Sequence, residues 1–333
     1  MKKPVALKLQ VKRLLLSVSF CPFFTSLVLA ENLEFDNNDS ESQHSLSFEV
    51  TRTDDQVDVP TKDTARIVSV EVLKHSLSYS YQLTGHWSMS LSAMTAKDQT
   101  EGNSASFEFP SLNSVSLNKD IGVFSSAISY QYDIWSWDLG LSFEGAKTEL
   151  SGTSKATKLA FQERARSAEI YAASSVEIAW RSFIFAPSVG LAVQKSKIER
   201  VAEFSLPATN AREEVNDKDS GGYLSTGVNA AYLLNLDDGG FFSRILWVPS
   251  VSVSWSEIVW GEVVSNSRFQ WKNDRVSNSS TSAQKEKSEG GSGSYAASLF
   301  IILDDYYADL SFSKNFGRGA EGKELSMIVG LDF

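Results

Sequence analysis

The chain ends on Leu325-Ser326-Met327-Ile328-Val329-Gly330-Leu331-Asp332-Phe333, a stretch with a large apolar side chain at every second position and an aromatic residue last. Successive side chains of a β-strand point to opposite faces, so a strand here has one apolar and one polar face. The apolar face carries Leu325, Met327, Val329, Leu331 and Phe333, and the polar face carries Glu324, Ser326, Gly330 and Asp332. We therefore expect the terminus to form one strand of a larger sheet.

The other end of the chain has the composition of a secretory signal peptide. Five basic residues precede an apolar run over 14–30, and Val28-Leu29-Ala30 places small or slim residues at the usual cleavage positions. The run contains Pro22 and leads directly into the polar stretch 31–43, which argues against a retained membrane helix. The sequence predicts that residues 1–30 are removed during secretion.

Removal of the signal peptide makes the chain more acidic. Five of its 31 Lys and Arg lie there and none of its 41 Asp and Glu, so 26 basic residues remain against 41 acidic ones, a net charge of −15. No cluster of Lys and Arg suited to phosphate backbones stands out, which excludes nucleic acid as an expected partner. The one cysteine, Cys21, is also in the signal peptide, so the mature chain is expected to have no disulfide and no thiolate metal site.

Alternating windows like the terminal one recur along the mature chain. They lie at 87–93, 135–143, 183–193 and 247–255, and several begin or end at a Trp. Each approaches the roughly 9–11 residues of a transmembrane strand. The polar faces carry mostly Ser, Gly and Ala, whereas a solvated strand of a soluble sandwich normally carries Lys, Glu, Thr and Arg. The pattern favours membrane strands with Trp at the interfaces. Pro187 and Pro249 fall inside two of these windows, and each predicts a bulge or a strand end.

Short and long connections alternate between these windows. Five joins, such as 84–86 and 133–134, have hairpin length, whereas four joins at 97–120, 147–167, 195–222 and 261–294 are long and polar. Bacterial barrels have short periplasmic turns and long extracellular loops. We count about twelve strands, with ten or fourteen as alternatives, because the apolar parity changes inside 67–83 and because 106–109 and 268–271 resemble strand extensions above the membrane.

The terminal strand with its final Phe333 resembles the C-terminal recognition strand of Gram-negative outer-membrane β-barrel proteins. The resemblance implies an all-β fold, a transmembrane antiparallel up-and-down barrel over 44–333, with 31–43 as a polar segment and candidate plug. It also implies a place in the outer membrane, contact with its lipid and lipopolysaccharide, and recognition of Leu325–Phe333 by the barrel-assembly machinery. Closure of the barrel would pair this strand with the one near 45–51.

Candidate functional residues are the charges that strand parity turns toward the lumen. These are Asp138, Glu144, Glu177, Asp309, Glu324 and Asp332, with Arg181 and Arg244 as cationic counterparts. Charged linings set ion selectivity, so an acidic excess would favour cations. The same groups could instead pair across the lumen and fill it.

Sequence motifs for catalysis are weak. Gly317-Arg318-Gly319-Ala320-Glu321-Gly322 has dinucleotide-binding spacing, but it joins two predicted strands without a helix. His86-Trp87-Ser88 resembles the His-x-Ser pair of outer-membrane lipid hydrolases, in which the His activates the Ser hydroxyl. His44 and His75 are the other histidines, and no His pair has metal-ligand spacing. The sequence predicts no metal and no cofactor.

These features lead to three functional hypotheses. The first is a passive channel or porin for small solutes or ions. The second is a surface, adhesion or structural barrel that uses its long loops, and the third is a lipid hydrolase built on His86 and Ser88. An autotransporter is a weaker hypothesis, because 31–43 is too short for a passenger.

Overall fold

The computed structural model describes residues 44–60, 65–103, 114–153, 158–206, 209–235, 245–273, 277–287, 290–303, 305–317 and 322–332. The predicted signal peptide, the segment 31–43, Arg244, Phe333 and the 106–109 extension lie outside them. The strands are β1 (His44–Pro60), β2 (Ala65–Thr84), β3 (Trp87–Asn103), β4 (Ser114–Tyr132), β5 (Trp135–Thr153), β6 (Lys158–Val176), β7 (Ile178–Trp180), β8 (Phe183–Leu206), β9 (Thr209–Tyr232), β10 (Leu234–Asn235), β11 (Ile245–Asn273), β12 (Ser277–Lys287), β13 (Gly291–Leu303), β14 (Tyr306–Gly317) and β15 (Gly322–Asp332).

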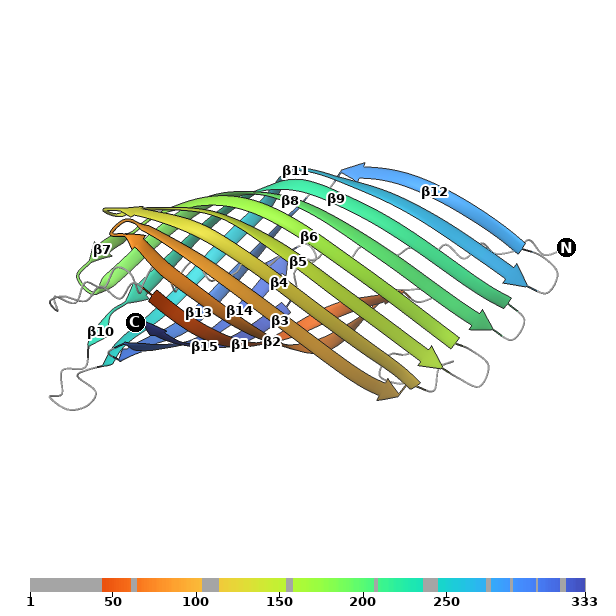
Figure 1. The fold of residues 1–333 in the computed structure, drawn as a ribbon, viewed down its shortest axis with the longest axis horizontal. Coiled ribbons are helices and arrows are strands. Elements are labelled where there is room, and N and C mark those ends of the chain that lie inside the picture. The colour runs from red at the N-terminus through yellow and green to blue at the C-terminus, as the bar shows by residue number, and fades with distance from the viewer. Residues whose placement is uncertain are drawn as a thin grey trace.

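The strands form a closed antiparallel barrel (Figure 1). Twelve strands make the ring, since β7 continues β6, β10 continues β9 and β12 pairs only with β11. The ring closes where β15 pairs with β1, from Ser45 opposite Asp332 to Asp54 opposite Lys323. The predicted fold, the strand number and the closing pair are confirmed.

Proline explains the two interruptions in the barrel wall. Pro187 lies opposite the end of β6, and pairing between β6 and β8 stops at Ser188 and resumes between β7 and β8 at Phe185. Pro249 has the same place between β9 and β10, because pairing with β11 stops at Ser250 and resumes at Trp247. Proline has no N–H to donate to the neighbouring strand. Each proline therefore removes a short stretch of one ladder while the barrel stays closed.

One half of each long strand presents an apolar surface outward. On β5 the outward side chains from Trp135 to Phe143 are all exposed, with Leu139 at 59%. Such exposure in a continuous band indicates contact with hydrocarbon rather than water. The edge of this band beside the short turns carries Trp87, Trp135 and Trp180. Its opposite edge carries Trp255 and Trp260. Outer-membrane barrels have short turns on the periplasmic side, so both described ends of the chain lie on that side.

The expected long loops are mostly β-strand, which corrects that part of the sequence prediction. β5 and β6 continue to Thr153 and Lys158, β8 and β9 to Leu206 and Thr209, and β11 to Asn273. In Figure 1 these strands rise far beyond β13, β14 and β15, so the barrel is tall on one side only. The predicted extension at 268–271 is confirmed as part of β11. β12 adds to the upper half of β11 from Glu262 onward, where pairing with β13 has ended.

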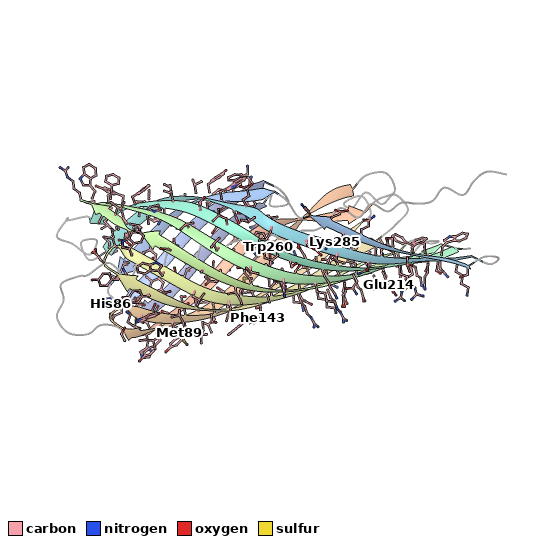
Figure 2. The ribbon with its side chains drawn as sticks, turned by 90° about the horizontal axis from the view of Figure 1, so that it is seen from above. His86, Met89, Phe143, Glu214, Trp260 and Lys285 are labelled. Atoms are coloured by element: carbon pink, nitrogen blue, oxygen red, sulfur yellow. The ribbon has the colours of Figure 1, made fainter. Side chains whose placement is uncertain are left out.

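The polarity of the two faces is exchanged along these strands: the outward face changes from apolar to polar and the inward face from polar to partly apolar. On β5, Leu150 points inward and is buried, while Lys147 and Ser151 point outward into water. We call the part of these strands beyond the apolar band the extracellular sheet. In Figure 2, Phe143 and Trp260 lie nearer the end with the short turns, and Glu214 lies far out along the sheet toward the other end. On β11 a bulge between Ile258 and Trp260 turns both Val259 and Trp260 outward at the boundary.

β2 differs from the prediction in one detail. The parity change inside 67–83 suggested a bulge or two elements. Pairing with β1 nevertheless runs without a shift from Tyr81 to Ala65, so β2 is one regular strand on that side. Its only shift is toward β3, between Gln82 and Thr84 at the turn.

Candidate functional site: the barrel lumen

The lumen wall is built from small hydroxyl side chains that pair with each other. Serines on neighbouring strands hydrogen-bond across the ladder at 2.6–2.8 Å: Ser92 with Ser125, Ser136 with Ser175, Ser250 with Ser298, Ser254 with Ser294 and Ser311 with Ser326. Each of these serines alternates with an outward apolar residue. A serine can donate one hydrogen bond and still accept others. The wall is thus polar and its hydroxyls already have partners.

Acidic side chains line the same face. Of the predicted residues, Asp138 and Asp332 accept hydrogen bonds from Ser129 and Ser45 on neighbouring strands. Asp309 is 7% exposed and accepts from Ser298, and its Oδ1 has no hydrogen-bond partner among the residues that the structure describes. Glu144 faces inward on β5.

One cation balances part of this charge. Lys74 Nζ on β2 lies 3.5 Å from Glu324 Oε2, and Thr53 donates to the same oxygen at 3.4 Å. Glu324 is therefore held against the wall. Among the described residues, Lys74 is the basic side chain that faces the lumen at the height of the apolar band. Counted over the described residues, the inner wall of the membrane-spanning part is acidic.

Arg181, one of the two predicted cationic counterparts, does not provide that balance. The inward prediction for Arg181 is wrong, because this residue occupies the turn after β7 with a positive φ of 56° and its guanidinium lies 5.3 Å over the exposed ring of Trp180. Parity failed there because the residue belongs to a turn rather than to a strand. Glu177 lies at the interruption between β6 and β7, where its backbone N–H donates to the Ile134 carbonyl. Arg244 lies outside the described residues.

At the height of the apolar band, the sequence analysis missed three charged residues that face the lumen in the described part of the chain. Glu49 accepts hydrogen bonds from Thr51 and Ser76, Glu169 is 8% exposed and lies close enough to Glu144 for mutual repulsion, and Lys74 pairs with Glu324. All three alternate with outward apolar residues such as Phe48, Ile170 and Leu73. The same parity that found Asp138 would have found them.

Glycine creates room for aromatic rings on the lumen side. A Cβ at Gly140 would lie 2.3 Å from the ring of Tyr171, and one at Gly330 would lie 2.0 Å from the ring of Tyr307. Each ring therefore lies flat across the neighbouring strand at a glycine instead of projecting into the lumen. Close approach of this kind is a common reason for glycine inside a strand.

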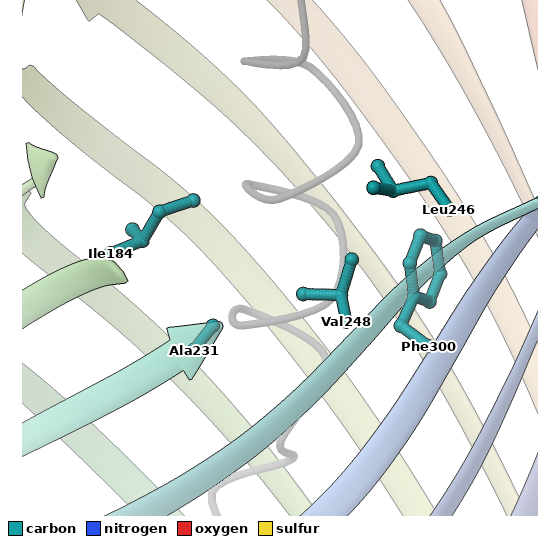
Figure 3. Packing of buried hydrophobic residues seen from close by; sticks show 5 residues of the cluster. All are labelled: Ile184, Ala231, Leu246, Val248 and Phe300. Carbon is teal, nitrogen blue, oxygen red and sulfur yellow. The ribbon is translucent and has the colours of Figure 1, made fainter. Parts of the chain in front are cut away.

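An apolar cluster occupies the inner face at the periplasmic end. It consists of Ile184, Ala231, Leu246, Val248 and Phe300, as Figure 3 shows, and Leu233, Ile302 and Tyr307 pack against it. Val248 is completely buried and Phe300 is 3% exposed. These residues come from β8, β9, β11 and β13 beside the short turns. The lumen is therefore polar in its middle and apolar on this side of its periplasmic end.

The structure separates the two residues of the predicted hydrolase pair. His86 is exposed in the turn before β3, and its ring centroid lies 6.1 Å and 5.9 Å from those of Tyr130 and Tyr132. Those tyrosines belong to the outward aromatic band, whereas Ser88 faces the lumen. No hydrogen bond joins His86 and Ser88 in the described part of the chain. The arrangement provides no base for the Ser88 hydroxyl.

Within the described ranges no group of three or more His, Cys, Asp or Glu has the geometry to hold a metal ion. No helix in the same ranges is long and apolar enough to cross a membrane.

Known proteins resemble this chain in fold alone. No protein-family model and no curated protein matches the sequence. The translocator domain of autotransporter NalP from Neisseria meningitidis superposes with a TM-score of 0.56 at 9% identity, covering 93% of this chain and 95% of that one. The β domain of the Bordetella autotransporter BrkA gives a TM-score of 0.51 at 10% identity, covering 88% of this chain and 100% of that one.

Both structures are barrels of the outer membrane, and their likeness extends over nearly the whole described chain. Together with the closed twelve-strand ring and the outward apolar band, it defines the class. The protein has the fold of a Gram-negative outer-membrane β-barrel. Barrels of one architecture serve different functions, so the function must be argued from the lumen and the surfaces.

Proposed function

We propose that the protein is a passive outer-membrane channel for small solutes or ions, with a preference for cations. The observation that carries the proposal is the acidic inner wall. Glu49, Asp138, Glu144, Glu169 and Asp309 face the lumen within the membrane-spanning part, and one described cation, Lys74, faces them. Rings of carboxylates raise the local concentration of cations and repel anions.

The apolar cluster at the periplasmic end favours a narrow channel and not a wide pore. A twelve-strand barrel is intermediate between the filled eight-strand barrels and the open porins. Ile184, Val248 and Phe300 reduce its width at the periplasmic end and offer no hydrogen bonds to a hydrated ion. Apolar constrictions resist wetting, so we expect low conductance and brief openings.

Planar-bilayer recording of the purified chain under a salt gradient tests the proposal. We expect single-channel steps and a reversal potential that shows cation preference. The double substitution Glu144→Gln with Glu169→Gln should move that potential toward zero, because it removes two neighbouring lumen carboxylates. Glu149→Gln is the matched control, since Glu149 is on the outer face paired with Lys147 at 2.8 Å. Absence of conductance, or an anion preference, would overturn the proposal.

The second candidate is a surface-interaction barrel, and the extracellular sheet favours it. Strands β5, β6, β8, β9, β11 and β12 carry a broad outer face above the membrane, on which charges of both signs pair. Arg212, for example, contacts Glu203 and Glu214. Shortening the hairpin of β11 and β12 to the level of Glu262 should reduce surface adhesion and leave conductance unchanged. Unaltered adhesion would remove this candidate.

A further inference from the structure

Basic side chains gather at one place on the outer face of the extracellular sheet. Arg164 and Arg166 come from β6, Lys195 and Lys197 from β8, and Lys218 from β9, and all five are exposed. We call these residues the basic patch. β6 pairs with β8 and β8 with β9, so the patch spans three adjacent strands.

The cations of the basic patch are arranged unfavourably for the protein alone. Arg166 is directly opposite Lys197, and Lys197 is directly opposite Lys218, so three like charges form one row across three strands. Like charges in directly opposed positions destabilise a sheet. Elsewhere on this face opposite charges pair, as Arg212 does with Glu203. The row is therefore not explained by the packing of the sheet.

One carboxylate lies within the patch. Glu199 contacts Lys197 at 2.5 Å, while Arg166, Lys195 and Lys218 form no ion pair with a described residue. The bonded Lys197 lowers the pKa of the Glu199 carboxyl, and Arg166 and Arg164 lower it further. A carboxylate affected in this way reports a positive local potential. A single Glu199 leaves four positive charges of the five uncompensated.

The basic patch lies immediately above the hydrocarbon boundary. Arg166 and Lys197 are four residues beyond Ile170 and Val193, whose outward side chains are 63% and 48% exposed. At about 3.3 Å per residue and a strand tilt near 45°, four residues correspond to a height of roughly 9 Å. The headgroup region extends about 5–8 Å beyond the hydrocarbon on each side. Long Lys and Arg side chains at this height reach the headgroup phosphates.

We infer that the basic patch binds phosphorylated lipid headgroups of the outer leaflet. Charge complementarity and continuity with the apolar band identify the occupant: acyl chains would lie along Ile170 and Val193 while phosphates meet Arg166, Lys197 and Lys218. The bound phosphates would also relieve the repulsion within the row. This inference is independent of the channel proposal, because all the residues involved are on the outer face.

Lipid binding by the full chain in a neutral detergent tests the inference. The probe is diphosphorylated lipid A in mixed micelles, and native mass spectrometry counts the lipid retained at each concentration. The test variant combines Arg166→Gln, Lys197→Gln and Lys218→Gln. The control combines Lys158→Gln, Arg268→Gln and Lys272→Gln, three exposed cations of β6 and β11 that lie farther along these strands from the apolar band.

We expect the test variant to bind more weakly by about fivefold per cation removed, on the order of 100-fold in total, and the control to bind like the wild type. A difference in gel mobility between heated and unheated samples verifies that each variant is folded. Weaker binding of the wild type at high salt gives a second readout without mutation. Equal affinity of test variant and wild type would overturn the inference. Equal loss in the control, retained binding of dephosphorylated lipid A, or displacement by micromolar inorganic phosphate would do the same.

Discussion

Arg200 holds three strands of the extracellular sheet together, and its replacement by Met should loosen them. Its Nε lies 2.6 Å from Glu163 Oε2 on β6, and its Nη1 lies 3.1 Å from Asp217 Oδ2 on β9. The three side chains are 6%, 10% and 10% exposed. Arg200→Met would leave two buried carboxylates without their cation. Breaking a buried ion pair from one side costs about 3–5 kcal/mol.

Arg212 provides a matched control on the same sheet. It also contacts two carboxylates, Glu203 at 2.9 Å and Glu214 at 2.8 Å, but its side chain is 47% exposed. Water and salt screen such pairs, so Arg212→Met should cost about 0–1 kcal/mol. The two variants differ chiefly in burial. The difference between them therefore isolates desolvation from charge removal.

Hydrogen exchange of the backbone amides of β8 and β9 above the membrane measures the effect. A loss of 3–5 kcal/mol corresponds to roughly 100- to 1,000-fold or more faster exchange through local opening, at about tenfold per 1.4 kcal/mol. Adding Glu163→Gln and Asp217→Asn to Arg200→Met should restore part of the protection, because no buried charge remains. Exchange in Arg200→Met within about threefold of that in Arg212→Met would refute the reasoning.

Three further changes have expected outcomes. Leu139→Arg places a charge in the middle of the outward apolar band and should destabilise the barrel by about 2–4 kcal/mol in urea unfolding from lipid vesicles, whereas Ser142→Arg on the lumen side should cost less. Gly140→Ala should displace the Tyr171 ring, lower stability by about 1–3 kcal/mol, and be relieved by Tyr171→Ala. Ser88→Ala should leave the lipid A profile of whole cells unchanged, and loss of a deacylated species would contradict the separation of His86 from Ser88.

The membrane-spanning part was predictable because its physical signal is simple. A strand in contact with lipid needs an unbroken apolar outward face, and its backbone N–H and C=O groups must be hydrogen-bonded within the barrel. Windows such as 135–143 therefore predict both the strand and which side chains point outward. Pairing of the terminal strand with β1 followed from closure. Leu325, Met327 and Val329 are outward with 44–52% exposure, as their parity predicts, while Leu331 is half-buried at the periplasmic end.

Apart from the extension at 268–271, the extracellular sheet was not predicted, because its composition is that of a loop. The apolar outward face of β5 ends at Phe143, and the outward residues that follow, Lys147, Glu149 and Ser151, are polar. The alternation continues with its sign reversed, since Thr148 and Leu150 point inward and are buried. The apolar cluster at the periplasmic end was not predicted either, because the pattern at 247–255 identifies the outward residues and gives no packing partner for the inward Leu246 and Val248. An alternating sequence pattern shows which residues share a face of a strand, but it does not show whether that face meets lipid, water or the packed interior.

β8 shows how a change of solvent along one strand defines the molecule's surfaces. Outward side chains are apolar through Val193 and charged from Lys195 to Glu199, while inward ones change from Gly190 and Ala192 to Ile198 and Arg200. No shift occurs in its pairing with β9 over this range, so the same ladder serves both environments. The height of the wall is therefore set by inward packing above the membrane, not by bilayer thickness. The basic patch is on the outer face of this tall wall and the acidic lumen residues are on its inner face nearer the periplasm, so the proposed lipid binding and the proposed conduction are expected to respond to separate mutations.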